Sequence, residues 1–275
     1  MKIILSRKGF DSKNGGVPSP ILEDGTLVSL PIPSNDDISY DQISAGECSL
    51  GKLLSDLTKG KIKETAQTHL DPDLNPASMK REAGWRPLFG QSKGARTHLC
   101  EIGKGDLSLF FGWFREAKRN HAGEYVFVRS APQLHVLFGW LQVECVWNCE
   151  EDEIPSWAQQ HPHARGKYGS TFVSSNHLLK SQISGGGVFK RFSESLRLTA
   201  PDQSRSIWRL PKWFYPFHTN SEREPLSHHK LKDNWKLNRE YVELQSAKIG
   251  QEFILKADEY PEAIDWAHKI ISQNQ

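Results

Sequence analysis

The spacing of apolar residues along the chain predicts more strands than helices. The strongest strand candidates are rich in aromatic and β-branched side chains, and they cover residues 107–114, 125–129, 134–147 and 171–174. Weaker strands are expected at residues 2–5, 26–30 and 252–256. Apolar residues recur at helical spacing in two stretches, residues 50–57 and a segment that follows Pro261 and ends near residue 272. Because no long helical crossovers separate the central strands, the chain is predicted to have an α+β fold.

Two central segments suggest how these strands are arranged. A Gly105-Asp106 turn precedes the strand at residues 107–111, and the strand at residues 136–143 returns beside it. This pattern, over roughly residues 100–175, is similar to the small β-barrels of the PUA, EVE and ASCH group, which hold nucleotides or modified bases. We therefore expect a mixed or antiparallel sheet with a central PUA/EVE-like β-barrel portion and peripheral helices.

The chain of 275 residues is expected to form a single domain, 1–275. Its composition divides it into a loop-rich N-terminal part (1–98), a barrel-like β core (99–180) and a basic C-terminal part (181–275). Residues 161–240 contain fourteen Lys and Arg against six Asp and Glu, a net charge of +8, whereas the rest of the chain has a net charge of −6. This asymmetry points to a polyanion or a phosphorylated ligand. A solvated surface of mixed charge is the alternative.

The composition excludes several classes of protein. Hydrophobic residues make up 37 % and charged residues 25 % of the chain, which is typical of a globular protein and not of a disordered one. The most apolar stretch, residues 134–143, is half the length that a membrane span needs, so no membrane partner is expected. The apolar run at residues 3–5 is too short for a secretory signal. Four cysteines without a CxxC pair predict neither a disulfide framework nor a structural zinc site, which favours a reducing cytoplasm.

The segment that follows the first strand has the most unusual local sequence, SRKGFDSKNGGVPSP at residues 6–20. Its glycines would let backbone N–H groups approach an anion. Arg7 and Lys8 would neutralise that anion, and Asp11 would accept a hydrogen bond from a ribose hydroxyl or act as a base. The segment matches neither a Walker loop nor GxGxxG. A hairpin whose glycines supply positive φ is the alternative.

A second candidate is HLDPDL at residues 69–74, which begins with His69. Pro72 biases Asp71 toward an extended conformation, so Asp71 and Asp73 are expected on one face. There, one carboxyl would have a raised pKa or both would bind a divalent metal. The alternative is turn chemistry around a proline, which needs no ligand.

A third candidate is REAGWRPLFGQSKGAR at residues 81–96, where arginines stand near Trp85 and Phe89. Arg86 beside an exposed aromatic side chain suits a phosphate next to a stacked base. Gln91 of the same segment is a further candidate for nucleotide binding. Alternatively, the two aromatic side chains anchor a loop to the core.

The tripeptide Phe-Gly-Trp occurs twice in the predicted strands, ending at Trp113 and at Trp140. A glycine inside a strand often lets a planar ligand or another backbone come close. The two tryptophans would then form the walls of a base pocket, with Arg115, His135 or Gln142 at its edge. Because most aromatic residues in strands belong to the core, burial without a ligand is the alternative.

Two histidine pairs, His161 with His163 and His228 with His229, would bind metal in a suitable context. Neither pair has a nearby cysteine or an HExxH motif, so exposed or hydrogen-bonded core histidines are favoured. No metal ligand is therefore predicted, and no cofactor can be named. The motifs GxSxG and HxE…PCxxC and a nucleophilic-cysteine signature are missing from the sequence, which disfavours the standard hydrolase and deaminase mechanisms.

Taken together, these motifs resemble one known family. The segments that carry the likeness are residues 6–12, 15–16, 69–74, 84–91, 105–115, 135–143, 208–214 and 226–229. Over most of its length the chain is similar to the third type of nucleotide modification associated domain, found in bacteria and their phages. The resemblance implies a role linked to modified nucleotides in DNA, with partners in a DNA-modification or phage-defence gene cluster. It names a pathway rather than a reaction.

The leading hypothesis is a protein that binds or processes a nucleotide or a DNA base. Its catalytic candidates are Asp11, Asp71, Asp73 and His69. Its nucleotide-binding candidates are Arg7, Lys8, Arg86, Gln91, Trp113, Arg115, His135 and Trp140. The alternatives are a non-catalytic PUA/EVE-like reader of modified or flipped bases and a structural partner in a defence complex. Convergence of the carboxylates on the aromatic pocket would favour an enzyme, and scattered carboxylates would favour a reader.

Overall fold

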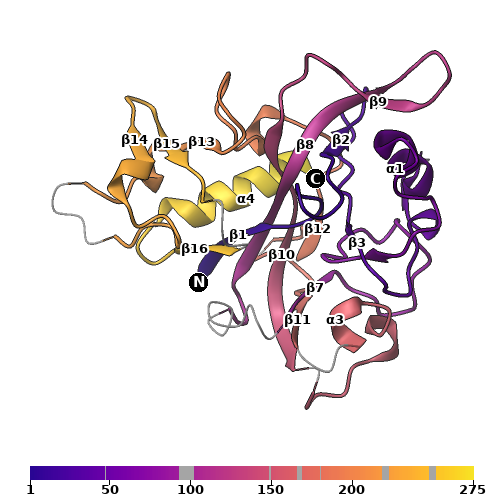
Figure 1. Ribbon diagram of the computed structural model, residues 1–275. Helices are drawn as coiled ribbons and strands as arrows, with labels where there is room; N and C mark the ends of the chain where they lie inside the picture. Colours follow the sequence, from indigo (N-terminus) through magenta and orange to yellow (C-terminus); the bar gives the residue numbers. More distant parts are fainter. Residues whose placement is uncertain are drawn as a thin grey trace.

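The computed structural model describes residues 1–46, 48–92, 102–148, 150–165, 169–179, 181–218, 223–247 and 252–275. A sheet of nine strands runs through the molecule and carries the main core (Figure 1). Its path is β16 (Glu252–Lys256), β1 (Lys2–Arg7), β8 (Leu107–Arg119), β10 (Leu134–Asn148), β11 (Gly169–Ser174) and β7 (Leu88–Ser92). Three short strands pair with strands of this path. Two of them, β2 (Ser19–Ile21) and β9 (Tyr125–Phe127), pair with β8, and β12 (Gly186–Val188) pairs with β10.

The pairing of these strands confirms the predicted α+β fold with a mixed sheet. β1 and β2 run parallel to β8, whereas the other pairs of the sheet are antiparallel. β8 and β10 are buried on both faces where they pair, which explains why both read as continuous apolar runs. The sheet path has separate ends at β16 and β7, so the described strands form no closed barrel. The PUA/EVE-like barrel is therefore unconfirmed.

Smaller elements surround this sheet. The strands of the smaller sheets are β13 (Ile207–Pro211), β15 (Tyr241–Gln245) and β14 (Trp235–Leu237) in one, β3 (Ile32–Pro33) and β6 (Thr68–His69) in a second, and β4 (Ser44–Ala45) and β5 (Cys48–Ser49) in a third. The described α-helices are α1 (Leu50–Thr58), α3 (Pro162–Arg165) and α4 (Glu262–Asn274). The short 3₁₀ helices are η1 (Tyr40–Gln42), η3 (Ser156–Ala158), η4 (Glu194–Leu196), η5 (Lys212–Phe214) and η6 (Lys232–Asn234). None of the described helices combines the length and the apolar character needed to cross a membrane.

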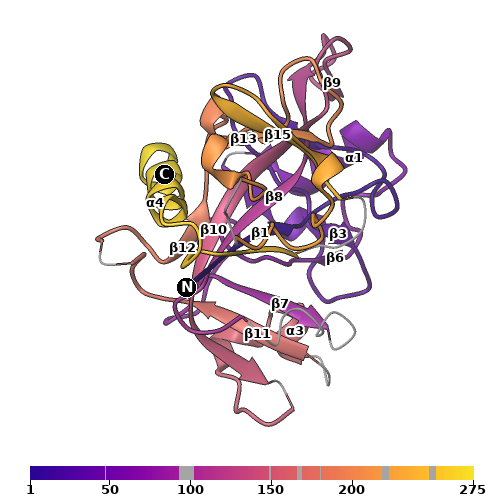
Figure 2. The same ribbon diagram turned by 90° about the vertical axis from the view of Figure 1, so that its left-hand side faces the viewer.

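The two longer helices form because their apolar residues recur on one face. The buried face of α1 holds Leu50, Leu53, Leu54 and Leu57. The helix ends where Lys59 adopts the left-handed conformation, with a φ of 55°. The buried face of α4 holds Ala263, Ala267, Ile270 and Ile271. α1 and α4 lie on opposite sides of the large sheet (Figures 1 and 2).

The structure corrects one predicted strand. Residues 26–30 form no strand, because Thr26 and Leu27 make only isolated bridges and the N–H of Leu30 donates to the Ser19 hydroxyl at 3.0 Å. The backbone groups of this segment are thus satisfied by separate partners rather than by one neighbouring strand. The other predicted strands and both predicted helices are present, with ends that differ by a few residues.

The large sheet places the end of β1 beside the middle of β8. Arg7 lies opposite Phe111, and the N–H of Lys8 extends the pairing by donating to the Phe111 carbonyl at 2.9 Å. The chain then turns away from the sheet at Gly9, which has a φ of 81°. In a different part of the sheet, α3 packs against β7 and β11 (Figure 2).

Candidate functional site

A cavity of about 250 Å³ lies beyond the end of β1. Its walls come from segments that are far apart in the sequence, namely the loop after β1, β3, β6 and the residues that follow it, β7, and α3. The lining residues are Arg7, Lys8, Gly9, Asp11, Asn14, Ile32, His69, Asp71, Gln91 and His163. Six of the predicted site residues are therefore brought together, and they are Arg7, Lys8, Asp11, His69, Asp71 and Gln91.

The loop after β1 is shaped by turn chemistry. The Asp11 carboxylate accepts hydrogen bonds from two N–H groups of the following turn, both at 2.7 Å. Gly15 has a φ of +90°, and a Cβ there would lie 2.1 Å from the Phe10 ring, so this position requires glycine. The glycines supply the positive φ angles expected of a turn, and the turn leaves Arg7 and Lys8 in the cavity wall.

Asp71 is a buried carboxylate, with 4 % of its side chain exposed. Its Oδ2 lies 2.8 Å from the Nζ of Lys8, and its Oδ1 accepts a hydrogen bond from the N–H of Gly90 at 2.7 Å. The Nε2 of His161 lies 3.3 Å from Oδ1. Burial favours the protonated carboxyl, but the charge of Lys8 and the contact with His161 outweigh burial and hold the pKa of Asp71 well below its usual range. Asp71 is therefore a carboxylate, not a proton donor, at neutral pH.

His163 reaches the cavity because glycine occupies the facing position of β7. A Cβ on Gly90 would lie 2.2 Å from the Cβ of His163, so a side chain there would displace His163. The Nε2 of His163 lies 3.8 Å from the Oδ2 of Asp71. Burial lowers the pKa of His163 to about 4, against the opposing effect of Asp71. The His163 ring is therefore neutral at neutral pH.

His69 completes this group from the end of β6. Its Nδ1 lies 2.7 Å from the Oδ2 of Asp36, and its Nε2 lies 3.0 Å from the Nε2 of His163. Burial raises the pKa of Asp36, but hydrogen bonds from Ser34 and His69 outweigh burial and lower it. Because an ionised carboxylate only accepts hydrogen bonds, Nδ1 of a neutral His69 carries the proton and its Nε2 offers a lone pair.

Arg7 forms a rigid part of the cavity wall. Its guanidinium carbon lies 5.6 Å and 5.5 Å from the ring centres of Phe111 and Phe253. One terminal nitrogen donates to the Ala247 carbonyl at 2.7 Å. These contacts orient the Arg7 guanidinium within the cavity wall.

Arg205 lies near Arg7 and adds a second positive charge. Burial and the charge of Arg205 lower the pKa of Arg7, whereas Asp11 raises it. Burial also lowers the pKa of Arg205, again against Asp11. The Arg205 guanidinium lies 4.4 Å from the ring centre of Trp113, and its Nη1 is buried without a hydrogen-bond partner among the described residues. The negative charge of Asp11 therefore stabilises the charged forms of both guanidiniums.

Asp73 and Gln91 have structural partners of their own. Asp73 accepts a hydrogen bond from Arg81 at 2.7 Å, and it is not one of the residues that line the cavity. Asp71 and Asp73 are thus held by different basic residues, although both line a separate cavity of about 90 Å³. Burial raises the pKa of Asp73 against the charge of Arg81, as expected for one of the two carboxyls. Gln91 does line the cavity, and its side-chain amide donates to the Glu252 carboxylate.

The two predicted walls of a base pocket do not face each other. Trp113 lies opposite His135 and Trp140 lies opposite Leu109, so the tryptophans are four positions apart along the β8–β10 pair. That spacing corresponds to about 13 Å, which is too far for both to stack on one base. Trp140 is buried, and its ring N–H donates to the Ser184 carbonyl at 3.0 Å. Trp140 is thus a core residue.

The glycines of the two Phe-Gly-Trp tripeptides lie against other backbone segments. A Cβ on Gly112 would lie 3.0 Å from the Lys8 carbonyl oxygen, and one on Gly139 would lie 2.8 Å from the Gly187 carbonyl oxygen. Of the two predicted reasons for a glycine in these strands, close approach of backbone therefore applies.

The remaining predicted residues do not line this cavity. His135 is buried and accepts a hydrogen bond from the ring N–H of Trp208 at 2.9 Å. Arg115 donates to the Arg129 carbonyl at 2.8 Å. Arg86 lies near Glu144 and Cys145 of β10. Lys104 lowers the pKa of Glu144 with a smaller contribution from Arg86, whereas burial raises the pKa of Cys145 against the charge of Arg86.

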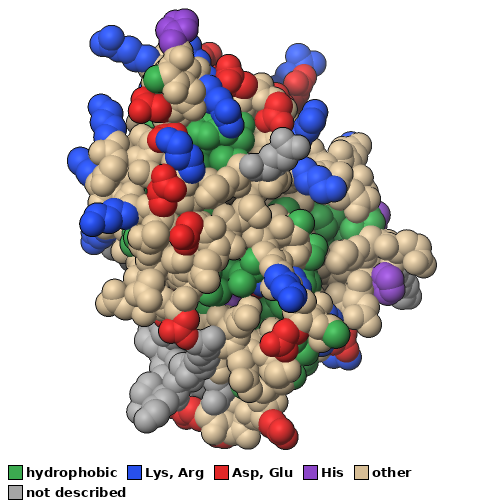
Figure 3. All heavy atoms as spheres, turned by 90° about the vertical axis from the view of Figure 1, so that its right-hand side faces the viewer, with side chains coloured by type: hydrophobic (Ala, Val, Ile, Leu, Met, Phe, Trp, Pro, Cys, Tyr) green, Lys and Arg blue, Asp and Glu red, His purple; other side chains and the backbone are tan. Residues whose placement is uncertain are grey.

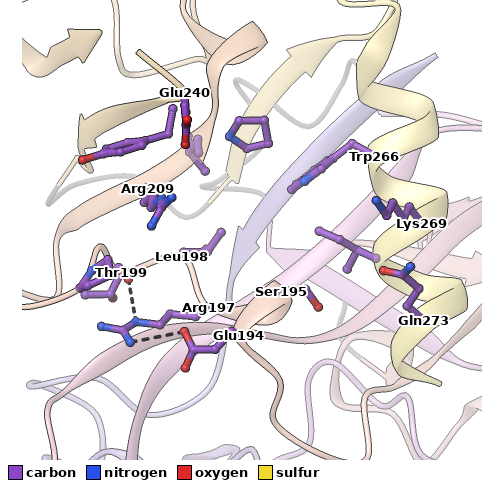
Figure 4. Close-up of a pocket in the computed structure, with 15 residues that line it drawn as sticks. Glu194, Ser195, Arg197, Leu198, Thr199, Arg209, Glu240, Trp266, Lys269 and Gln273 are labelled. Atoms are coloured by element: carbon purple, nitrogen blue, oxygen red, sulfur yellow. Dashed lines mark hydrogen bonds and ion pairs between the residues drawn. The ribbon is translucent and has the colours of Figure 1, made fainter. Parts of the chain in front are cut away.

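A larger cavity of about 460 Å³ lies between α4, β13 and residues 194–201 (Figure 4). Its basic lining residues are Arg197, Arg209 and Lys269. Arg197 donates to the Thr199 carbonyl at 2.8 Å and pairs with Glu194. Arg209 lies over the Tyr241 ring. This cavity contains none of the predicted site residues, and its lining includes no histidine or cysteine. The smaller cavity, with its buried carboxylate and imidazoles, is therefore the better candidate.

Surface charge does not mark a third site on the face drawn in Figure 3. Lys and Arg side chains there alternate with acidic ones, and apolar side chains appear between them.

Sequence reasoning missed or set aside four residues that adjoin the site. Asp36 and Arg205 belong to no motif that distinguishes them from other charged residues. His161 and His163 did give a signal, the H-x-H spacing, but their partner Asp71 lies far away in the sequence. Only the fold brings the carboxylate to that pair.

The comparisons with known proteins agree with the resemblance of the motifs. Neither the curated proteins nor the solved structures contain a match to the chain. A family model described as nucleotide modification associated domain 3 matches residues 2–256, which include every residue that lines the smaller cavity. The chain therefore belongs to the nucleotide modification associated domain 3 family.

Proposed function

We propose that the cavity at the end of β1 binds one nucleotide unit, free or within a nucleic acid, and acts on it chemically. The observation that carries this proposal is the convergence of Arg7, Asp11 and Asp71, with two histidines, on one cavity. Membership of a nucleotide-modification-associated family supplies the class of ligand.

The side of the cavity near Arg7 would hold the phosphate. The guanidinium of Arg7 is already oriented by two phenyl rings, so little side-chain entropy would be lost on binding. Arg205 repels Arg7, and Asp11 offsets only part of that repulsion. An anion beside the two arginines would therefore be stabilised by both charges.

The size of the cavity limits the ligand. Its volume of about 250 Å³ lies near the lower end of small-molecule sites, about 300 Å³. Such a space suits a single nucleotide unit, including one flipped out of a duplex, rather than a dinucleotide cofactor.

The buried charges favour an enzyme over a reader. Lys8 and Asp71 form an ion pair whose side chains are 8 % and 4 % exposed. Burying such a pair contributes little net stability, and clusters of perturbed titratable groups in cavities are typical of functional sites. A reader needs stacking walls instead, and the two candidate tryptophans are too far apart to form them.

The binding part of this proposal is tested with a matched pair of variants. Arg7→Gln removes a charge from the smaller cavity, and Arg209→Gln removes one from the larger cavity. Calorimetric titration with deoxynucleoside monophosphates should show binding that is lost in Arg7→Gln and kept in Arg209→Gln. Loss in Arg209→Gln alone would move the ligand to the larger cavity, and no binding by the unaltered protein would refute the proposal.

The chemical part is tested on DNA from cells. The nucleoside composition of the DNA, measured by mass spectrometry, should differ between cells that contain the unaltered protein and cells that lack it. Asp71→Asn keeps the shape of the side chain and removes its charge, so it should abolish the difference while the protein still accumulates. Nucleotide binding without any change in nucleosides would instead identify a reader.

A further inference from the structure

We propose that His69, Asp71 and His163 form a binding site for a divalent first-row transition-metal ion. The role of this ion rests on the proposed function, because the ion would face the nucleotide unit bound in the same cavity. Its geometry stands on its own, and its test needs no nucleotide.

The three donor atoms are spaced as ligands of a single ion. One atom from each side chain lies within 4.8 Å of the other two. The Nε2 atoms of His69 and His163 are 3.0 Å apart, and the latter lies 3.8 Å from an oxygen of Asp71. Ligands at about 2.0–2.2 Å from an ion are separated by about 2.9–3.5 Å at octahedral or tetrahedral angles. The separation between the two histidines already lies in this range, and the separations from Asp71, at most 4.8 Å, would shorten as the side chains close around the ion.

The orientation of His69 is a second, independent observation. Its Nδ1 lies 2.7 Å from the carboxylate of Asp36, which accepts a further hydrogen bond from the Ser34 hydroxyl at 2.7 Å. Metal-binding histidines commonly donate their other ring N–H to a carboxylate in this way, which directs the lone pair of Nε2 at the ion. Here that lone pair faces His163 and the cavity.

The orientation of Asp71 fits the same role. Its Oδ1 is occupied by the N–H of Gly90 and the nearby ring of His161, whereas its Oδ2 is the atom closer to His163. One carboxylate oxygen is thus anchored to the protein and the other is presented to the cavity. A carboxylate anchored in this manner would act as a monodentate ligand.

Lys8 already places a positive charge at this position. Its Nζ lies 2.8 Å from the Oδ2 of Asp71 and 3.3 Å from the Gly90 carbonyl oxygen. An ion bound to Oδ2 would repel this ammonium group and release it toward the nucleotide phosphate. Lys8 and the metal would therefore compete for one oxygen, and removal of the lysine charge should strengthen metal binding.

The donor set indicates the class of ion. Two imidazoles and one carboxylate suit Zn²⁺, Fe²⁺, Co²⁺ and similar ions, whereas Mg²⁺ and Ca²⁺ prefer oxygen ligands. Three protein ligands also leave coordination positions open for water or for an oxygen of the nucleotide. Such an ion would activate a bound water or polarise the group that reacts.

The test is a metal titration of the full chain after removal of bound metal with a chelator. Co²⁺ and Zn²⁺ are the probes, and elemental analysis gives the stoichiometry. We expect one ion per chain and a Co²⁺ spectrum without thiolate charge-transfer bands. Mg²⁺ at the same concentration should not compete. Failure of the unaltered protein to bind either probe stoichiometrically would overturn the inference.

Variants locate the ion. His69→Gln and His163→Gln should each weaken Co²⁺ binding by about tenfold or more, as should the loss of the supporting carboxylate in Asp36→Asn. The matched control is His121→Gln, which alters an exposed histidine and should bind as the unaltered protein does. Equal binding by His163→Gln and the control would place the ion elsewhere.

The Lys8→Met variant distinguishes loss of the metal site from misfolding, because it should bind Co²⁺ more tightly than the unaltered protein. A damaged fold cannot mimic that gain, and unchanged or weaker binding by a folded Lys8→Met variant counts against the inference. The two proposals also fail separately. Metal binding without nucleotide binding would refute only the proposed function, and nucleotide binding without metal binding would refute only the metal site.

Discussion

The Nε2 atoms of His69 and His163 lie 3.0 Å apart, although 94 residues separate the two histidines in the chain. In a neutral His69 the proton resides on Nδ1, which faces the Asp36 carboxylate. Its Nε2 therefore needs either a proton donated by His163 or a cation between the two rings. Both arrangements require His163 of α3 to stay close to β6, and His163 can do so because Gly90 of β7 has no side chain.

Gly90→Ala should disrupt this relationship directly. The new Cβ would lie 2.2 Å from the Cβ of His163, so α3 must shift. We expect a loss of about 1–3 kcal/mol in the free energy of unfolding and weaker Co²⁺ binding. Gly103→Ala is the control, because a Cβ there meets nothing within 4 Å. Equal stability and metal binding in the two variants would show that His163 can move without consequence. Chemical denaturation and metal titration provide the measurements.

Local patterns were sufficient to predict most of the fold. The apolar runs of β8 and β10 reflect burial on both faces, and the heptad-like leucines of α1 reflect one buried face. The failures depend on partners that a local window does not contain. Residues 26–30 have strand-like composition, but their hydrogen bonds go to several segments instead of one strand. Whether the sheet closes into a barrel depends on the positions of β16 and β7, which no local pattern encodes.

The candidate site was predictable where charge was locally unusual. Arg7, Lys8 and Asp11 crowd one loop, and that loop does line the cavity. The roles of the aromatic residues could not be predicted in the same way, because a tryptophan in a buried strand looks the same whether it packs in the core or stacks on a ligand. The proposed metal site could not be assembled from the sequence, which paired Asp71 with Asp73 and His163 with His161, because His163 and Asp71 come together only through the packing of α3 on β7.

Arg205→Gln should reduce nucleotide affinity without reducing stability. Arg205 repels Arg7 in the absence of ligand, so removal of its charge relieves repulsion in the folded protein. In the proposed nucleotide complex, the same change would remove a charge-assisted contact, which is worth roughly a tenfold change in affinity or more. Calorimetry with a deoxynucleoside monophosphate and thermal denaturation measure the two effects. Unchanged affinity would exclude Arg205 from the phosphate site.

The Lys8–Asp71 pair should show strong energetic coupling in metal-free protein. Lys8→Met leaves a buried carboxylate without its cation, which costs about 3 kcal/mol of stability. The double variant with Asp71→Asn should be far more stable than the sum of the single effects predicts, because the unpaired charge is gone. The exposed pair Lys104–Glu144 is the control and should show no measurable coupling. Additive effects at Lys8 and Asp71 in chelator would mean that the ion pair has no energetic role.

A separate pH effect should come from His229, which lies outside the cavity. Its Nδ1 lies 2.8 Å from the Ser227 carbonyl oxygen, and its Nε2 accepts a hydrogen bond from the N–H of Ala247 at 2.9 Å. A second ring proton would therefore point at an N–H group. Burial, with further effects from the charges of His228 and Arg7, lowers the pKa of His229 to about 4.

This lowered pKa predicts how stability responds to acid. Between the usual histidine pKa of about 6.5 and the folded value of about 4, the unfolded chain binds a proton that the folded protein excludes. The stabilisation is thus complete above pH 6.5 and is lost as the pH falls toward 4, by up to about 3 kcal/mol for this residue. His229→Gln should be less stable at pH 7.5 but should lose less stability on acidification, whereas the exposed control His121→Gln should follow the unaltered protein. Denaturant titrations at several pH values measure these slopes, and equal slopes in His229→Gln and the unaltered protein would mean that His229 accepts a proton in the folded state.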